Sequence, residues 1–542
     1  MSLWLFFWRF FLNQHIAGRY VKVLLWFLLI SSWTALYGGQ AWASDQALVV
    51  GCGADQYSKA RHYISFGKKA PYVWITEPLV YRGNDNRPVP GLIERWERNG
   101  SHYVLHVRQG IRFHNGRELD AEAIRFSLEI NALNRSETLR IKPDSYQIID
   151  KYTLAFDTAH TTVHFIGFMS HPFVSAYAPD TDFINHPIGT GPYRFLEYSR
   201  NRFIKVVRNE NYWGEKPYNK SITYRFVPDA QARLMSLLNG ECDIICGVDP
   251  QMLSALPPGG FYKKVVSPPK NYAVLTVNLH GEAPYDLLAD LWIRKAVAYA
   301  IDRGLIARVL YEGIAAPAKS ILAPWFWNQG DAFLDGYDYQ PDRATRLLEE
   351  AGWHTGPDGI RTKNGRPLKI RLVSGFPTAA DLKPLPELIQ QMLRKVGIEL
   401  EVIQTDDMGV YYGSYMAPGK GDLFLEKAGN TGPTPSWLLY MLYHSKSPWV
   451  DSGYKWSWPG ETFDQAIEEA QASTDGETVL NAIKRAQKIL IDETCAVIPL
   501  LFLSDVYLTR PDIEFNPETQ GGYTSFGNAK RMVSGTVPKD KP

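Results

Sequence analysis

The sequence has few cysteines, almost no net charge and no long apolar run after its N-terminal region. Four cysteines in 542 residues are too few for a fold held together by disulfides. The 58 lysine and arginine residues nearly balance the 57 aspartate and glutamate residues, which argues against a nucleic-acid partner, since that would need a basic stripe. The last two thirds contain no G-x-G-x-x-G or P-loop pattern, so nucleotide chemistry has no support.

The N-terminal region has the pattern of an export signal. Residues 1–43 contain no acidic residue and three basic ones, followed by the apolar run 23–37 and an A-x-A tripeptide that ends at Ala43. The run is shorter than the roughly 20 residues of a membrane span. The pattern predicts cleavage near Ala43 and export to the periplasm, with a retained anchor as the alternative. Without its signal, the chain keeps 55 basic and 57 acidic residues.

The cysteines leave two questions open. Cys52 ends the sequence VVGC, which loosely matches the site of a membrane-anchored lipoprotein, but 48–53 is more typical of the first buried strand. Cys242 and Cys246 are four positions apart in a predicted strand, about 13 Å along it, which is too far for a disulfide. A bond between Cys52 and Cys495 stays open.

The organisation of the chain indicates a mixed α/β protein of several domains. About 500 mature residues exceed a single core, so two or three domains are expected. Strand-like and helix-like segments alternate. We predict strands at 48–53 and 101–108, a helix capped by Asp120, and a helix that stops before Gly240. Later helices are predicted near 290–301, 341–352, 385–397 and 461–471.

A series of landmarks covers nearly the whole mature chain and resembles the family 5 extracellular solute-binding proteins of ABC importers. A single landmark is weak evidence for membership of a family. Here many landmarks occur together, in the same order along the chain as in the family. They are PVPGLIERWE (88–97), FHNGRELDAEAIRFSLE (113–129), HPIGTGPYRF (186–195), VRNENYWGEKP (207–217), FVPDAQARLMSLLNGECDI (226–244), VNLH (277–280), IRKAVAYAIDR (293–303), ARVLYEGIAAPA (307–318), PDRATRLLEEAGW (341–353) and NGRPLKIRL (364–372).

The resemblance implies a two-lobed periplasmic-binding-protein fold of the cluster C type with an additional small domain. It places lobe I at 44–76, 188–285 and 497–542, the small domain at 77–187, and lobe II at 286–496. Ligand would be held between the lobes. The protein would act as a monomer and deliver its ligand to permease subunits of the inner membrane. No catalytic cofactor is expected.

The landmarks around Gly189 and Asn209 are predicted to build the scaffold and not to touch ligand. Glycine and proline in PIGTGPY suit a tight turn. In RNENYW the asparagines are turn formers. Tyr212 and Trp213 are expected to be buried beneath this turn and to anchor it.

Within the family, the landmarks are most similar to nickel-binding members. Peptide-binding members place an aspartate in the segment that here reads GNTGPTPSWLL (429–439), where it pairs with the ligand's ammonium group. Asn430 stands at that position. A buried ammonium without a carboxylate partner is costly, so a dipeptide, oligopeptide or opine is the alternative and not the first choice.

Nickel-type members carry a histidine in the same lobe II segment and an arginine in the small domain. Here Glu426 stands where the histidine is expected, and His171 stands where the arginine is expected. The hypothesis is that these two face each other and share a metal chelate or a cationic ligand, with His171 as a metal ligand. The alternative is that His171 packs at a helix end and Glu426 pairs with Lys427.

Four further residues are candidates for contact with ligand. Tyr411 and Tyr412 lie in the segment that carries a cleft tyrosine in nickel-type members. Arg140 would replace the missing guanidinium, and Trp437 would stack on ligand or pack in the core.

Two other functions are alternatives to a role in import. The sequence contains no G-x-S-x-G, H-E-x-x-H or S-x-x-K arrangement with its partners, so a hydrolase is not expected. A sensory binding protein that presents its ligand to a receptor uses the same closed form, and the sequence does not separate it from an importer component.

Overall fold

The computed structural model describes most of the chain after the N-terminal region. The described residues are 46–53, 75–83, 88–134, 141–158, 165–170, 176–179, 186–256, 260–324, 326–327, 329–375, 382–407, 409–429, 434–448, 450, 454–473, 475–517, 519–520, 523–524 and 526–532. The chain divides into two compact units, residues 1–47 and 48–542. The predicted signal at 1–43 lies outside the described residues.

A seven-stranded sheet gathers strands from distant parts of the sequence, in the order β12-β22-β11-β1-β10-β9-β8. These strands are β1 (Ala47–Cys52), β8 (Tyr193–Ser199), β9 (Phe203–Arg208), β10 (Ser221–Phe226), β11 (Ile244–Cys246), β12 (Lys263–Val266) and β22 (Val506–Thr509). The strand predicted at 48–53 is confirmed as β1, which runs parallel to β11. Cleavage before Cys52 would remove residues paired in this sheet, which argues against the lipoprotein alternative.

A four-stranded antiparallel sheet has the order β4-β5-β7-β6. Its strands are β4 (Ile93–Asn99), β5 (His102–Val107), β6 (Gln147–Asp150) and β7 (Thr153–Asp157). Helix α5 (Ala121–Asn134) packs on β7, and Asp120 caps it, since Ala123 N donates to Asp120 Oδ1 at 2.9 Å. The predicted strand 101–108 and the predicted helix after Asp120 are thus confirmed. The short helix α7 (Phe165–Met169) follows.

A six-stranded mixed sheet has the order β14-β21-β13-β20-β18-β19. Its strands are β13 (Asn271–Val277), β14 (Ala316–Pro317), β18 (Lys369–Ser374), β19 (Glu399–Gln404), β20 (Leu423–Gly429) and β21 (Val497–Leu503). All seven residues of β21 are buried, as expected for a strand covered on both faces. Strands β13 and β21 fall in segments expected for lobe I, yet they pair within this sheet, whose other strands fall in the segment expected for lobe II.

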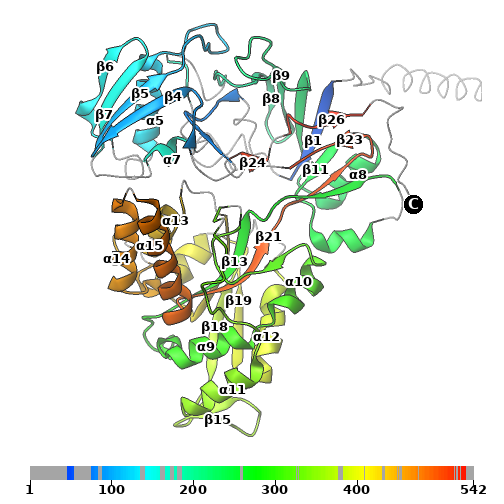
Figure 1. Cartoon of the computed structure of the whole chain (residues 1–542). Coiled ribbons are helices and arrows are strands. Elements are labelled where there is room, and N and C mark those ends of the chain that lie inside the picture. Colours follow the sequence, from blue (N-terminus) through cyan, green and yellow to red (C-terminus); the bar gives the residue numbers. More distant parts are fainter. Residues whose placement is uncertain are drawn as a thin grey trace, which may run out of the picture. The chain divides into compact units, whose positions relative to one another are not determined.

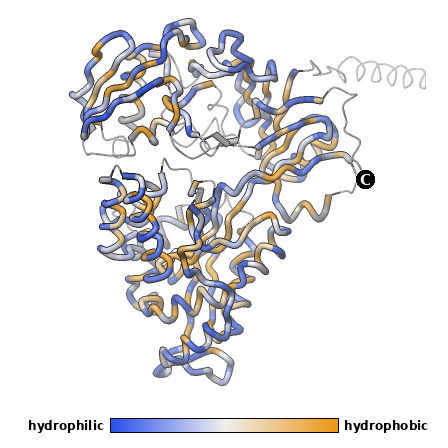
Figure 2. Tube along the Cα trace, in the orientation of Figure 1, coloured by the Kyte–Doolittle hydropathy of each residue, from blue (hydrophilic) through white to orange (hydrophobic). Residues whose placement is uncertain are grey.

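Helices follow the amphipathic pattern of the sequence. They are α8 (Ala230–Leu238), α9 (Leu291–Ala300), α10 (Arg303–Tyr311), α11 (Pro341–Glu350), α12 (Leu385–Lys395), α13 (Pro435–Tyr443), α14 (Glu461–Ala472) and α15 (Gly476–Lys488). Figure 1 shows α14 and α15 side by side, and hydrophobic and hydrophilic residues alternate along both (Figure 2). The five helices predicted beyond residue 230 are confirmed. Gly240, with φ of 74°, allows the chain to turn where α8 ends.

The smaller elements are short strands and single turns. They are β2 (Tyr81–Arg82), β3 (Pro88–Val89), β15 (His354–Thr355), β16 (Arg361–Lys363), β17 (Arg366–Pro367), β23 (Ile513–Glu514), β24 (Thr519–Gln520), β25 (Tyr523–Thr524), β26 (Lys530–Arg531), the 3-10 turns at Pro143–Ser145, Pro250–Ala255, Leu287–Ala289 and Lys455–Ser457, and the π-helical turns η5 (Val410–Met416) and η8 (Ile489–Glu493).

The glycine-rich turn and the RNENYW segment do build scaffold. A side chain at Gly189 would place its Cβ 2.1 Å from the carbonyl oxygen of Ile75, so only glycine fits there. Asn209 Nδ2 donates to the carbonyl of Gly191 at 3.2 Å, which holds the two landmarks together.

The anchor below these landmarks is a buried glutamate. Glu77 is 2% exposed and accepts hydrogen bonds from three side chains. Tyr212 Oη donates at 2.7 Å and Trp213 Nε1 at 3.1 Å, and Tyr81 Oη donates as well. Burial raises the pKa of Glu77, while the donors lower it. The predicted anchoring role of Tyr212 and Trp213 is therefore the role that the structure gives them.

Candidate ligand-binding site

Glu426 lies on an interior strand of the six-stranded sheet. It is directly opposite Val274 in the pairing of β20 with β13, and its side chain is partly buried. Thr276, one diagonal step along β13 on the same face, donates from Oγ1 to Glu426 Oε2 at 2.5 Å. In the described part of the chain this is the one hydrogen bond of the carboxylate. A carboxylate accepts about four, so Glu426 keeps unused acceptor capacity.

The charge of Glu426 is surrounded by aromatic hydroxyl groups and not by cations. Burial raises the pKa of Glu426 to about 7, and the Thr276 hydrogen bond lowers it; no cation of the described residues takes part. Five tyrosines have pKa values raised first by burial and further by the charge of Glu426. They are Tyr272, Tyr411, Tyr412, Tyr443 and Tyr454.

The alternative pairing of Glu426 with a nearby lysine such as Lys427 finds no support among the residues described. Consecutive residues of a strand point to opposite faces of the sheet, and no ion pair joins these two among the residues described. The charge on Glu426 is therefore not neutralised by its neighbour in sequence.

The two candidate tyrosines have different environments. Tyr411 is fully buried in an aromatic cluster with Phe424 and Trp456, and its hydroxyl donates to the carbonyl of Leu425 at 3.0 Å. Tyr412 is only partly buried and meets the Tyr411 ring edge-on at 5.1 Å. Of the two, Tyr412 is the one that has surface to offer to a ligand.

Trp437 lies in the first turn of α13, which Thr434 caps. It is partly buried and packs against two hydrophobic clusters, the one around the six-stranded sheet and the one around the four-stranded sheet. The core-packing alternative for Trp437 is thus supported, and stacking on ligand stays a prediction.

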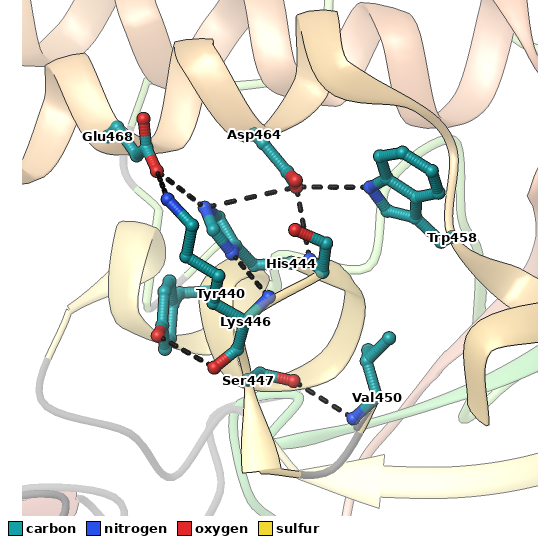
Figure 3. Close-up of polar contacts among 9 residues, drawn as sticks. Tyr440, His444, Lys446, Ser447, Val450, Trp458, Asp464 and Glu468 are labelled. Carbon is teal, nitrogen blue, oxygen red and sulfur yellow. Dashed lines mark hydrogen bonds and ion pairs between the residues drawn. The ribbon is translucent and has the colours of Figure 1, made fainter. Parts of the chain in front are cut away.

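The C-terminal end of α13 is fixed by a polar cluster (Figure 3). His444 Nδ1 accepts from Lys446 N at 3.0 Å, and its Nε2 lies 3.5 Å from Glu468 Oε1 and 3.9 Å from Asp464 Oδ1. Trp458 Nε1 donates to Asp464 at 3.2 Å. Burial lowers the pKa of His444. Because Tyr443 precedes His444, this cluster positions one of the five tyrosines around Glu426.

A cavity of about 100 Å³ lies at the carboxyl ends of β18 and β19. Its lining includes Leu425 but not Glu426, and it contains the ion pair of Lys383 with Asp406, at 3.1 Å. Ligands often bind at the carboxyl ends of parallel strands. The charges in this cavity neutralise each other, however, whereas the charge on Glu426 has no partner of opposite sign in the described residues.

The remaining predicted site residues, His171, Arg140 and Asn430, lie outside the described residues, so the pairing of His171 with Glu426 stays a prediction. Among the residues that are described, no three His, Cys, Asp or Glu side chains are grouped as a metal site requires.

Sequence reasoning missed Thr276 and the three tyrosines at 272, 443 and 454. The alternation in NYAVLTV (271–277) predicts a strand, but nothing in it shows which strand will lie beside β20. The tyrosines come from three separate segments, and only the fold brings them together.

Residues 87–448, about two thirds of the chain, match the bacterial extracellular solute-binding proteins, family 5 Middle. The chain belongs to this family. It is therefore a substrate-binding protein of the class that serves ABC importers, as its landmarks predict, and its relatives are binding proteins and not enzymes.

Two relatives with different ligands cover most of this solute-binding protein. The nickel-binding periplasmic protein of Escherichia coli is 29% identical over 81% of this chain and 86% of its own length. The dipeptide-binding protein of the same organism is 25% identical over 76% and 80%. NikA from Brucella suis in complex with Fe(III)-EDTA superposes with a TM-score of 0.79, 24% identity and coverage of 90% and 100%. The expected two-lobed fold is confirmed by this superposition.

None of the helices that the structure describes has the length and apolar character to cross a membrane.

Proposed function

We propose that this protein captures a positively charged ligand at Glu426 and delivers it to the permease of an ABC importer, with nickel or another transition metal in an organic chelate as the ligand. The observation that carries the proposal is the partly buried Glu426 carboxylate, which has one donor, Thr276, in the part of the chain that the structure describes. A cationic group would supply the missing partner, and pairing in a low-dielectric site strengthens the attraction. The likeness to the nickel-binding protein of Escherichia coli supports the choice of ligand.

The second metal-facing group in this proposal is His171. An imidazole nitrogen suits nickel and its neighbours in the first transition series, and the carboxylate of Glu426 faces the positive charge of the complex. The organic part of the chelate would fill the remaining metal positions. We propose that this organic part contacts Tyr412, Asn430, Arg140 and Trp437. Tyr411 would hold Tyr412 in place through the contact between their rings.

The proposed mechanism is capture and closure. One lobe binds the ligand first, and contacts from the other lobe favour the closed form. The lobe and small-domain boundaries given above belong to this proposal, with β13 and β21 as the strands that pass into the six-stranded sheet. Export by the signal at 1–43 would place the protein in the periplasm, beside the permease subunits.

The second candidate ligand is a short peptide or an opine. Here Glu426 would pair with an ammonium group, four residues before the position at which peptide-binding members hold their aspartate. The relationship to the dipeptide-binding protein supports this candidate. Both candidates use the same carboxylate, so only the identity of the bound molecule separates them.

The test is native mass spectrometry with metal analysis, on protein exported by its own host and purified without chelators or a histidine tag. Near-stoichiometric nickel or another transition metal, with the additional mass of an organic chelator, is the expected result. In that case His171→Ala and Glu426→Gln should each reduce the metal content, whereas the exposed Glu210→Gln should not. A metal-free protein that carries a peptide would overturn the metal proposal and support the peptide.

A further inference from the structure

Two cysteines that are far apart in sequence face each other across neighbouring strands. β1 and β11 run parallel, with Val50 opposite Ile244 and Gly51 opposite Ile245. One step further along the same register, Cys52 lies beside Cys246. Their sulfur atoms are 3.4 Å apart. This juxtaposition joins positions 194 residues apart in the chain.

The backbone geometry of the pair suits a covalent bond between the two sulfurs. Neighbouring strands lie about 4.8 Å apart, within the roughly 4.4–6.8 Å between Cα atoms that disulfides span. Both side chains lie on the face of the sheet that carries Val50, Ile244 and Tyr224. Rotation about the Cα–Cβ bonds can therefore bring the sulfurs to bonding distance without a movement of the strands.

The other two cysteines have no such neighbour. Cys242 lies in a different cluster, on the face of Gly51, and its sulfur accepts from Ser236 Oγ at 3.3 Å. Cys495 is buried in the core of the six-stranded sheet, where burial raises its pKa to about 11. A bond between Cys52 and Cys495, which the sequence leaves open, is thus excluded by their places in the fold, and the bond between Cys242 and Cys246 stays excluded.

We propose that Cys52 and Cys246 form a disulfide in the exported protein. The inference rests on membership of an extracellular family and not on the ligand, because disulfides form and persist outside the cytoplasm. The two thiols lose two protons and two electrons as the S–S bond forms. The electrons reduce an external disulfide, of an oxidoreductase or of oxidised glutathione, which leaves as two thiols by exchange. Cys52, which is partly exposed, is the sulfur that the external disulfide reaches first.

The bond would hold the first strand of the mature chain to the middle of the seven-stranded sheet. Closing a loop of this length restricts the unfolded chain and so favours the folded state. The strand concerned is the one directly after the predicted signal, which is the end of the chain most prone to fray. The disulfide would therefore keep lobe I intact at its N-terminal edge.

The test is alkylation of the denatured protein before and after reduction, followed by peptide mass mapping, on protein exported by its own host. We expect a peptide that links Cys52 to Cys246, a mass lower by two hydrogen atoms than that of the reduced protein, and alkylation of Cys242 and Cys495 alone before reduction. The matched controls Cys242→Ala and Cys495→Ala should keep the linked peptide, and Cys246→Ala should lose it. Alkylation of all four cysteines before reduction, or a different linked pair, would overturn the proposal.

A second measurement does not depend on the yield of a variant. Reductant should lower the midpoint of thermal unfolding of the unaltered protein, and should leave that of Cys52→Ser unchanged. Equal midpoints of the unaltered protein with and without reductant would contradict a stabilising bond. Ligand content should be the same before and after reduction, which separates this proposal from the one about Glu426.

Discussion

Two glutamates of this protein, Glu77 and Glu426, are both taken out of water and both have raised pKa values, yet their surroundings differ. Glu77 accepts hydrogen bonds from three side chains, Tyr81, Tyr212 and Trp213. Among the described residues, Glu426 accepts one, from Thr276. The tyrosines near Glu426 do not add to this number, because among the described residues none of their hydroxyl groups donates a hydrogen bond to its carboxylate.

Under the proposed function, the difference separates a carboxylate that builds the fold from one that would be available to a ligand. A buried polar group is costly when its hydrogen bonds are unmade. The three donors around Glu77 remove that cost and fix the turn above it. The carboxylate of Glu426 keeps part of the cost, which a cationic ligand would remove on binding. Desolvation alone therefore does not mark a functional residue; the shortage of partners does.

The largest expected effect is the loss of stability in Glu77→Ala. The change removes a buried acceptor and leaves the hydroxyls of Tyr81 and Tyr212 and the Trp213 indole without their partner. We expect a loss of about 3–5 kcal/mol in the free energy of unfolding, measured by urea denaturation. Glu210→Ala, in the RNENYW landmark that Glu77 anchors but exposed to solvent, is the control and should leave the midpoint nearly unchanged. Equal midpoints for the two variants would remove the distinction drawn above.

For Glu426→Gln we expect a change in the free energy of unfolding of the opposite sign, which is a gain in stability. The folded-state pKa of Glu426, about 7, lies above the ordinary 4.5, so the folded protein binds this proton more tightly than the unfolded chain does. The contribution of Glu426 to stability is therefore fully present below pH 4.5 and is lost as the pH rises through 7. Glutamine never ionises and keeps an acceptor for Thr276. We expect Glu426→Gln to be more stable than the unaltered protein at pH 8, by about 1–3 kcal/mol.

The affinity for ligand should fall in Glu426→Gln, although the stability of the variant rises. Glu426→Gln should weaken binding of Ni(II) supplied with histidine by at least about tenfold, measured by calorimetry at pH 8. Together, higher stability and weaker binding identify a residue kept for function at a cost in stability. A variant with lower stability and unchanged affinity would assign Glu426 to the scaffold, together with Glu77.

The sequence predicts much of the fold because its signals are local. The cap at Asp120 and the helix stop at Gly240 depend on residues within one turn, and both are where they were expected. Sheet membership is not local. The pairing of β13 with β20 brings residues 271–277 beside 423–429, and no nearby residue specifies that partner. The segments expected for lobe I consequently include β13 and β21, which pair in one sheet with strands from the segment expected for lobe II.

The candidate site was predictable only in part, for the same reason. Glu426 stands out in sequence only through the resemblance to nickel-type members, which leads one to expect a histidine at this position. Its single donor, Thr276, is 150 positions away and has no sequence signal of its own. Likewise, the sequence offers Tyr411 and Tyr412 as equals, and only packing shows that one is buried and the other is not.

The pH dependence of binding gives the next test of the comparison. A cation pairs with the ionised carboxylate, and Glu426 ionises near pH 7 in the free protein. The affinity for the ligand should therefore fall by up to about tenfold per pH unit below 7 and be nearly constant above it. Titrations with a dipeptide, the second candidate ligand, run from pH 5 to 7, where its α-amino group stays charged and no chelating histidine changes its protonation. The slope should be absent in Glu426→Gln; a slope that persists in this variant would assign the proton to another group.

The smallest expected effects distinguish the two tyrosines beside Glu426. In Tyr411→Phe, the lost hydroxyl leaves the Leu425 carbonyl without its donor, so we expect a loss of about 1 kcal/mol in stability and an unchanged affinity. Tyr412→Phe removes a hydroxyl from a partly buried ring, so we expect unchanged stability and a severalfold weaker affinity, measured at pH 8 by calorimetry. If Tyr411→Phe instead weakened binding while Tyr412→Phe did not, the ligand would reach the aromatic cluster itself, and the boundary between scaffold and site would lie deeper in the sheet than the burial of Tyr411 indicates.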